Sequence, residues 1–173
     1  MKNFNRQFPG IKHICFAAEH DTKNFCDFMK DIKSDTIKFN RLADILTGKI
    51  ITLKNDIDLI ISVPKSKEEI RDTDYSLKIA EMISEKTNIP YLKDALVKTK
   101  KTRKLKTLPV ALRQKEIENA FEIKNFEGLK NKKVCIADDV LSSGSTIKEI
   151  IKLLTSVTDP KNVSIAVLVV QHS

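Results

Sequence analysis

Two adjacent carboxylates and a cluster of hydroxyl side chains lie close together in residues 134–146, which read VCIADDVLSSGST. Asp138 and Asp139 follow a hydrophobic run, and the loop after them opens a helix and contains Ser142, Ser143, Gly144, Ser145 and Thr146. Hydroxyls, a glycine that lets the backbone approach a ligand, and the free N–H groups of a helix start are typical of a monophosphate site. The loop is not a Walker loop, because the G-x-x-x-x-G-K pattern is missing.

The acid pair indicates which kind of phosphate ligand the loop would bind. Two carboxylates beside an anion site would repel phosphate alone. They favour a ligand with a phosphate at one end and hydroxyls or a magnesium complex a few ångströms away. A ribose 5-phosphate has this arrangement. The alternative is an ordinary strand-to-helix turn that happens to contain an Asp pair.

Positive charge is concentrated in one further segment. The chain has 31 Lys or Arg and 23 Asp or Glu, a net charge of +8, and residues 98–115 hold eight of the basic side chains and no acid. The rest of the chain is therefore neutral. One basic loop on a neutral body indicates a flap over a polyanion, and the alternative is a solvated loop in a lysine-rich protein.

Length and composition exclude several classes of protein. The 173 residues correspond to about one domain, and 41% hydrophobic with 31% charged residues is ordinary for a globular protein. Cys15, Cys26 and Cys135 have no C-x-x-C spacing, which excludes a zinc ribbon and favours a reducing cytoplasm. The longest apolar run, at 165–170, is far shorter than the roughly 20 residues of a membrane helix. No secretory signal is expected either.

The elements that would position these residues alternate between strands and helices from residue 58 onward. Hydrophobic runs at 59–63, 134–137 and 163–170 predict buried strands with helices between them. Apolar strands joined by amphipathic helices predict an α/β fold with a parallel sheet covered on both faces. Ligands of such sheets bind beyond the carboxyl ends of the strands, which here means the loops after Val63 and Ala137.

Two helices are expected before this core. Apolar residues at helical spacing predict one helix around residues 25–32 and a second around 42–46, which is expected to end before Gly48.

Residues 134–146 resemble the signature of type I phosphoribosyltransferases: four hydrophobic residues, two acids, two hydrophobics, then S/T-S/T-G-x-S/T. Ala137 is the one soft departure. The resemblance covers residues 58–173 and implies a single phosphoribosyltransferase-like domain with its core there. It also implies a small helical hood within residues 1–50, a basic flexible loop at 98–115, and a homodimer.

The rest of the chain is similar to the ComF-like branch of that family, which is associated with DNA uptake. The matching residues are Val63, Pro64, Ser66, Lys67, Arg71 and Asp74, and farther along Thr102, Leu108, Arg113, Ala120 and Phe121. The departures are Asp72, Thr73, Leu105 and Glu116. No counterpart of the N-terminal zinc ribbon of that branch is expected in these residues, because the three cysteines have no C-x-x-C spacing.

The resemblance implies a role for each part of the site. Type I enzymes use Mg²⁺ and transfer the 5-phosphoribosyl group of phosphoribosyl pyrophosphate to an acceptor. Asp138 and Asp139 would hold the ribose hydroxyls and their magnesium shell, and residues 142–146 would bind the 5-phosphate. Lys101 and Arg103 would act in catalysis from a cationic lid over the leaving group. The residues that would bind pyrophosphate are Pro64, Lys65, Ser66, Lys67 and Arg113.

Two hypotheses about function remain open. The first is a magnesium-dependent phosphoribosyltransferase with an unidentified acceptor. The second is a non-catalytic relative that senses phosphoribosyl pyrophosphate or a nucleotide, or that contacts single-stranded DNA through the basic loop during uptake or processing. Residues 98–115 contain no aromatic side chain on which unpaired bases could stack, which weighs against DNA.

Overall fold

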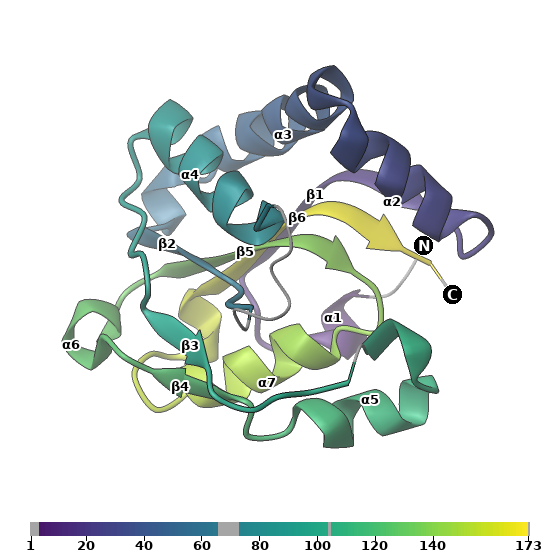
Figure 1. Cartoon of the computed structure of the whole chain (residues 1–173). Helices are drawn as coiled ribbons and strands as arrows, with labels where there is room; N and C mark the ends of the chain where they lie inside the picture. Colours follow the sequence, from purple (N-terminus) through teal and green to yellow (C-terminus); the bar gives the residue numbers. More distant parts are fainter. Residues whose placement is uncertain (1–3, 66–72, 104, 173) are drawn as a thin grey trace.

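The computed structural model of the chain describes residues 4–65, 73–103 and 105–172 (Figure 1). Helices and strands alternate along most of it. In chain order they are α1 (Phe4–Gln7), β1 (His13–His20), α2 (Phe25–Ser34), α3 (Thr36–Ile51), β2 (Leu59–Ser62), α4 (Tyr75–Thr87), β3 (Leu96–Lys98), α5 (Val110–Ile117), β4 (Phe121–Ile123), α6 (Phe126–Leu129), β5 (Val134–Leu141), α7 (Ser145–Leu154) and β6 (Val163–Gln171).

Four parallel strands form the main sheet, in the order β1-β6-β5-β2. Ala166 of β6 is aligned with Cys15 of β1 on one side and with Ala137 of β5 on the other. Most residues of the two central strands, β5 and β6, are buried, which is why these strands read as continuous hydrophobic runs. The parallel sheet predicted from the sequence is confirmed.

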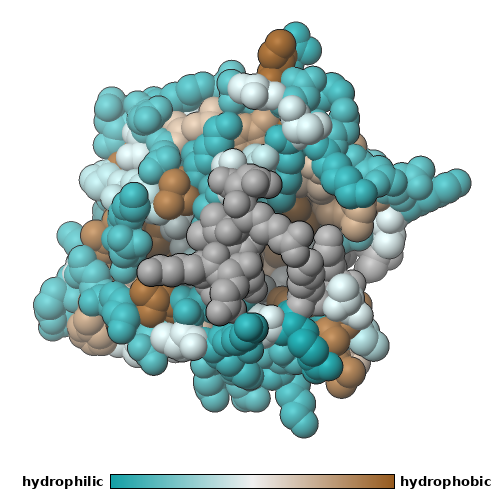
Figure 2. Space-filling model, in the orientation of Figure 1, coloured by the Kyte–Doolittle hydropathy of each residue, from teal (hydrophilic) through white to brown (hydrophobic). Residues whose placement is uncertain are grey.

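Helices cover both faces of this sheet, as predicted. α2, α3 and α4 pack on one face and α7 on the other (Figure 1). On α7, Ile147, Ile150 and Leu154 recur at helical spacing and are buried against the sheet. Hydrophilic residues cover most of the molecular face seen in Figure 2, with hydrophobic residues scattered among them.

The N-terminal segment contributes a strand to the core. β1 pairs in parallel with β6 and forms one edge of the sheet. Of its eight residues, Cys15 is the buried one, because an edge strand is covered less completely than a central strand. β1 therefore shows no continuous apolar run. The two helices expected before residue 58 are present as α2 and α3, and the strand that precedes them was not predicted.

The second N-terminal helix is longer than its sequence predicts. α3 passes through Gly48 and ends at Ile51. Leu46 and Ile50, on either side of the glycine, are fully buried against the sheet and α4. This packing outweighs the helix penalty of glycine, which is about 1 kcal/mol relative to alanine.

The basic segment 98–115 connects two short antiparallel strands. β3 and β4 pair Leu96 with Ile123 and Lys98 with Phe121. Between these strands the chain forms a single 3-10 turn at Leu105–Thr107 and then α5. A loop was expected over the whole segment, but residues 110–115 belong to α5.

The three cysteines are free thiols, with Cys15 and Cys135 buried and Cys26 exposed. Within the part of the chain that the structure describes, no helix combines the length and the apolar character needed to cross a membrane.

Candidate functional site

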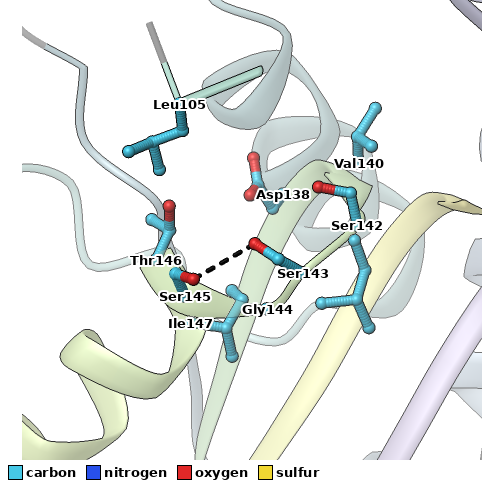
Figure 3. A pocket seen from close by; sticks show the side chains of 10 residues that line it. Leu105, Asp138, Val140, Ser142, Ser143, Gly144, Ser145, Thr146 and Ile147 are labelled. Atoms are coloured by element: carbon cyan, nitrogen blue, oxygen red, sulfur yellow. Dashed lines mark hydrogen bonds between the residues drawn. The ribbon is translucent and has the colours of Figure 1, made fainter. Parts of the chain in front are cut away.

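A pocket lies beyond the carboxyl end of β5, where the chain turns into α7. Asp138 and the whole loop 142–146 line it, and Leu105 of the basic segment lies over the Thr146 end of this loop (Figure 3). Gly144 adopts a left-handed conformation, with φ of 73°, directly before the first residue of α7. The pocket thus brings together the first-turn N–H groups of a helix and the hydroxyl side chains that were predicted to bind a phosphate.

Asp138 is buried in the wall of this pocket. Its Oδ1 accepts hydrogen bonds from Ser76 Oγ at 2.7 Å and from the backbone N–H of Asp139 at 2.9 Å. Burial is the main reason that the pKa of Asp138 rises to about 7, and the neighbouring Asp139 carboxylate adds to it. This carboxyl group can therefore hold or release a proton near neutral pH.

Asp139 is kept ionised by two lysines. The Nζ atom of Lys33 pairs with Asp139 Oδ2, and that of Lys65 lies 3.9 Å from the same oxygen. Burial by itself would raise the pKa of Asp139, but the charges of Lys65 and Lys33 outweigh it and lower this pKa to about 2. The two adjacent acids therefore differ in charge below about pH 7.

Lys65 links the acid pair to the loop after β2. Its Nζ lies 3.6 Å from Oδ1 of Asp74, the residue that caps the start of α4. Burial would lower the pKa of Lys65, but Asp139, Asp138 and Asp74 raise it above its usual value. Lys65 is therefore a fixed cation beside the acids. Of the other residues predicted for this loop, Pro64 precedes Lys65, whereas Ser66, Lys67 and Arg71 lie outside the described residues.

Lys33 is a residue of this site that the sequence does not reveal. It lies in the last turn of α2, and its backbone carbonyl accepts a hydrogen bond from the Tyr75 hydroxyl at 2.8 Å. Its Nζ also lies 4.7 Å from the centre of the Tyr75 ring. One lysine among many has no local feature that marks it, and only the fold places Lys33 at Asp139.

The residues before β1 contact the loop 142–146 directly. Gln7 Nε2 donates a hydrogen bond to the backbone carbonyl of Ser143 at 3.0 Å. A methyl group added at Gly144 would lie 2.5 Å from Gln7 Nε2 and 2.7 Å from Cζ of the buried Phe8 ring. Packing within the protein therefore requires a glycine at position 144. The sequence suggests a second reason for the glycine, namely the close approach of a ligand to the backbone. Neither Gln7 nor Phe8 was predicted to take part.

The two arginines of the basic segment form hydrogen bonds with residues within the segment or next to it. Arg103 Nη2 and Nε lie 2.7 and 3.0 Å from Oε2 of Glu116. Arg113 Nε donates to a backbone carbonyl of the same segment at 3.0 Å, and Lys101 is exposed. Among the described residues of the segment, Leu105 is the one that lines the pocket. The lid role predicted for Lys101, Arg103 and Arg113 thus needs a rearrangement of the segment.

The residues present do not form a magnesium cage. Over residues 4–65, 73–103 and 105–172, no group of three or more His, Cys, Asp or Glu side chains could hold a metal ion. Magnesium is usually held by one or two carboxylates together with ligand phosphates, which leaves Asp138 and Asp139 as candidates. Lys33 and Lys65 already balance the charge of Asp139. The two acids therefore do not fit a metal ion that is held by the protein alone.

Known proteins resemble this chain in sequence and in fold. A solved purine phosphoribosyltransferase from Pyrococcus horikoshii superimposes with a TM-score of 0.50, over 76% of this chain and 72% of that one. At 23% sequence identity, this likeness concerns the fold. A stretch of 50 residues is 44% identical to a protein of Methanococcus vannielii named transcriptional regulator GfcR. That match spans 29% of this chain and 24% of the regulator.

These likenesses do not separate the branches of the family, and the ComF-like assignment stays a prediction. The sequence pattern of one protein family, the phosphoribosyl transferase domain, matches residues 76–173. This range is more than half of the chain, and it contains Asp138, Asp139, the loop 142–146 and both central strands. The chain therefore belongs to the phosphoribosyl transferase domain family.

Proposed function

We propose that this protein binds phosphoribosyl pyrophosphate and transfers its 5-phosphoribosyl group to an acceptor. One observation supports this most: Asp138 and the loop 142–146 line the same pocket at the carboxyl end of β5. A phosphate loop beside a carboxylate that can accept hydrogen bonds from hydroxyls fits a ribose 5-phosphate group better than free phosphate. Membership of the phosphoribosyl transferase domain family supports the same class of reaction.

Each part of the pocket would act on a different part of the donor. The loop 142–146 would bind the 5-phosphate, and Asp138 and Asp139 would accept hydrogen bonds from the ribose hydroxyls. Positive charge develops on the ribose as its bond to pyrophosphate breaks, and these acids would stabilise it. The acceptor would form the new bond to the anomeric carbon while pyrophosphate leaves with the electron pair of the old one. Lys65 would balance the charge of the leaving group.

The remaining parts of the proposal follow the family resemblance. Mg²⁺ would come bound to the pyrophosphate of the donor, because Asp139 is already paired with lysines. Arg103 would leave Glu116 to join Lys101 and Arg113 in a lid over that pyrophosphate. The acceptor would lie under a hood from residues 1–50, of which α2 reaches the acid pair. A homodimer and a cytoplasmic location belong to the proposal as well.

Ribose 5-phosphate, and phosphoribosyl pyrophosphate with Mg²⁺, are expected to raise the melting temperature, because each would bind only the folded chain. At about one hundred times its Kd a ligand stabilises by about 2.7 kcal/mol. For a domain of this size that corresponds to roughly 5–10 °C. Differential scanning fluorimetry measures the shift, and ribose, which has no phosphate, is the control that should give none. If neither phosphorylated ligand shifted the melting temperature at millimolar concentration, the proposal would fail.

A non-catalytic role in nucleic-acid binding is the second candidate. Lys100, Lys101 and Arg103 are exposed on the basic segment, and part of the chain is similar to a protein named as a transcriptional regulator. In this role the segment would contact the phosphates of single-stranded DNA instead of pyrophosphate, and the pocket would sense a phosphoribosyl ligand.

Replacing Lys100 and Lys101 together with glutamine is expected to weaken phosphoribosyl pyrophosphate binding by about fivefold or more and to leave ribose 5-phosphate binding unchanged. The reason is that only the first ligand carries pyrophosphate for the lid to neutralise. Stability should change little, because both side chains are exposed. Calorimetry with the two ligands measures the difference. Lys130 and Lys132, exposed and outside the pocket lining, provide a control with the same change of charge.

The same pair of variants tests the second candidate. If the segment binds DNA, the wild type should bind a single-stranded oligonucleotide with an affinity that falls steeply as salt increases. The Lys100 and Lys101 double variant should then lose that affinity, and the control should keep it. Tight, salt-sensitive binding of this kind would place DNA ahead of pyrophosphate as the partner of the basic segment.

A further inference from the structure

Two ammonium groups from different elements converge on one carboxylate oxygen. Lys33, at the end of α2, pairs with Asp139 Oδ2, and Lys65, after β2, lies 3.9 Å from the same atom. The side chains of Lys33 and Asp139 are 29% and 14% exposed, so water screens this pair less than it screens a surface ion pair. The protein therefore balances the charge of Asp139 before any ligand binds.

One helix start holds both lysines in place. Tyr75, the first residue of α4, donates its hydroxyl to the backbone carbonyl of Lys33 and places its ring beside the Lys33 ammonium. Asp74, the residue before it, lies 3.6 Å from the Lys65 ammonium. The two cations are thus positioned by adjacent residues, and their place beside Asp139 is part of the packed structure.

A divalent cation bound at Asp139 would lie next to both ammonium groups. Like charges at this spacing repel strongly where water is partly excluded. A ribose meets no such barrier, because its hydroxyls are neutral donors. The other oxygen of each carboxylate, Oδ1 of Asp139 and Oδ2 of Asp138, can accept a hydrogen bond from such a hydroxyl.

We propose that Lys33 is a positioning residue whose ammonium group takes the place of a divalent cation at Asp139, so that this chain binds ribose 5-phosphate without magnesium. The inference rests on the proposed function, because it concerns the same ribose-binding acids. It gives α2 a defined role in the site, although α2 lies outside the residues that the family model matches. Magnesium then matters only for the pyrophosphate part of the donor.

Isothermal titration calorimetry with ribose 5-phosphate, once with EDTA and once with excess MgCl₂, tests this inference. The wild type is expected to show the same Kd within about twofold in both solutions. Lys33→Met keeps the apolar bulk of the side chain and removes its charge. It is expected to bind at least about tenfold more weakly in EDTA and to recover most of that loss in MgCl₂.

Two further variants serve as controls. Lys33→Arg keeps the positive charge and is expected to behave as the wild type in both solutions. Lys30→Met removes a lysine of the same helix that is exposed and paired with Asp27, and it should also bind as the wild type does. A merely structural role for Lys33 would weaken binding equally with and without magnesium.

The possible outcomes separate this inference from the proposed function. Wild-type binding that needs magnesium overturns the inference and leaves the proposed function in place. The same holds if Lys33→Met binds in EDTA as tightly as the wild type, or if added magnesium fails to restore its binding. No binding of ribose 5-phosphate by the wild type in either solution overturns the proposed function and the inference together. The wild-type measurement needs no variant, so the inference can fail even if Lys33→Met does not fold.

Discussion

Gly144→Ala is expected to abolish the binding of ribose 5-phosphate and to destabilise the folded chain by about 1–3 kcal/mol. The backbone φ of 73° disfavours any side chain at this position, and the new methyl group would lie 2.7 Å from Phe8 Cζ. The amide of Gln7 can swing away from the methyl group, but the Phe8 ring is 3% exposed and packed in the core. The loop must therefore shift, and its N–H groups would no longer point at the phosphate.

Gly48→Ala is the matched control for this substitution. Gly48 lies inside α3, and a methyl group there would meet no atom within 4 Å. This variant should bind ribose 5-phosphate as the wild type does and gain up to about 1 kcal/mol of stability, because alanine is the better helix former. Calorimetry and thermal unfolding of the two variants give both quantities. Unchanged binding by Gly144→Ala would show that the phosphate lies elsewhere.

Asp138→Asn is expected to remove ribose 5-phosphate binding and, at the same time, to stabilise the ligand-free protein above neutral pH. The ribose loses a charged acceptor, which accounts for the weaker binding. The fold keeps its hydrogen bonds, because Asp138 Oδ1 accepts from Ser76 Oγ and from the Asp139 N–H, and an asparagine oxygen can accept both. The substitution also removes a buried carboxyl group that is costly to ionise.

The direction of the pH effect follows from the pKa of Asp138 in the two states. Burial raises this pKa from 3.8 to about 7 in the folded chain, so between these values the folded state holds a proton that the unfolded state has lost. The unfolding free energy of the wild type therefore falls as pH rises through this window. The pKa of Asp139 is lowered to about 2, so its contribution to the unfolding free energy is fully present above about pH 5. This contribution is therefore constant between pH 5 and pH 8.

Urea unfolding at about pH 5 and pH 8 measures this effect. The difference in unfolding free energy between Asp138→Asn and the wild type should grow in favour of the variant by on the order of 2 kcal/mol from pH 5 to pH 8. Asp27→Asn, which changes an exposed carboxylate on α2, should show no such gain. A wild type and an Asp138→Asn variant with parallel pH profiles would mean that Asp138 does not ionise in this range.

The arrangement of the acid pair and the loop 142–146 could be predicted because the strand, the loop and the helix start that form it are contiguous in the sequence. The supporting residues could not be predicted in this way. Lys33 is 106 residues away from Asp139 in the chain, and Gln7 is 136 residues away from Ser143. Such contacts depend on how helices and strands pack, and one sequence contains no periodic pattern that reports them.

In the basic segment, a contact between residues close in the sequence could not be predicted either. Its excess of positive charge is evident from residues 98–115, and its exposed lysines agree with that pattern. The acid that pairs with Arg103 is Glu116, the residue immediately after this window. A count of charges places both residues in one region, but the ion pair depends on the turn and on α5, which bring them together.

The strand order has a consequence for how the chain folds. The two edge strands, β1 and β2, are synthesised before β5 and β6, the strands with which they pair. The sheet therefore cannot form until residues 134–171 have left the ribosome, and pairing between strands so far apart in the chain is slow. The apolar faces of α2 and α3 are exposed during this delay, when they can bind chaperones or other nascent chains. Substitutions in β6 should therefore lower the yield of folded protein more than equally destabilising substitutions in α4.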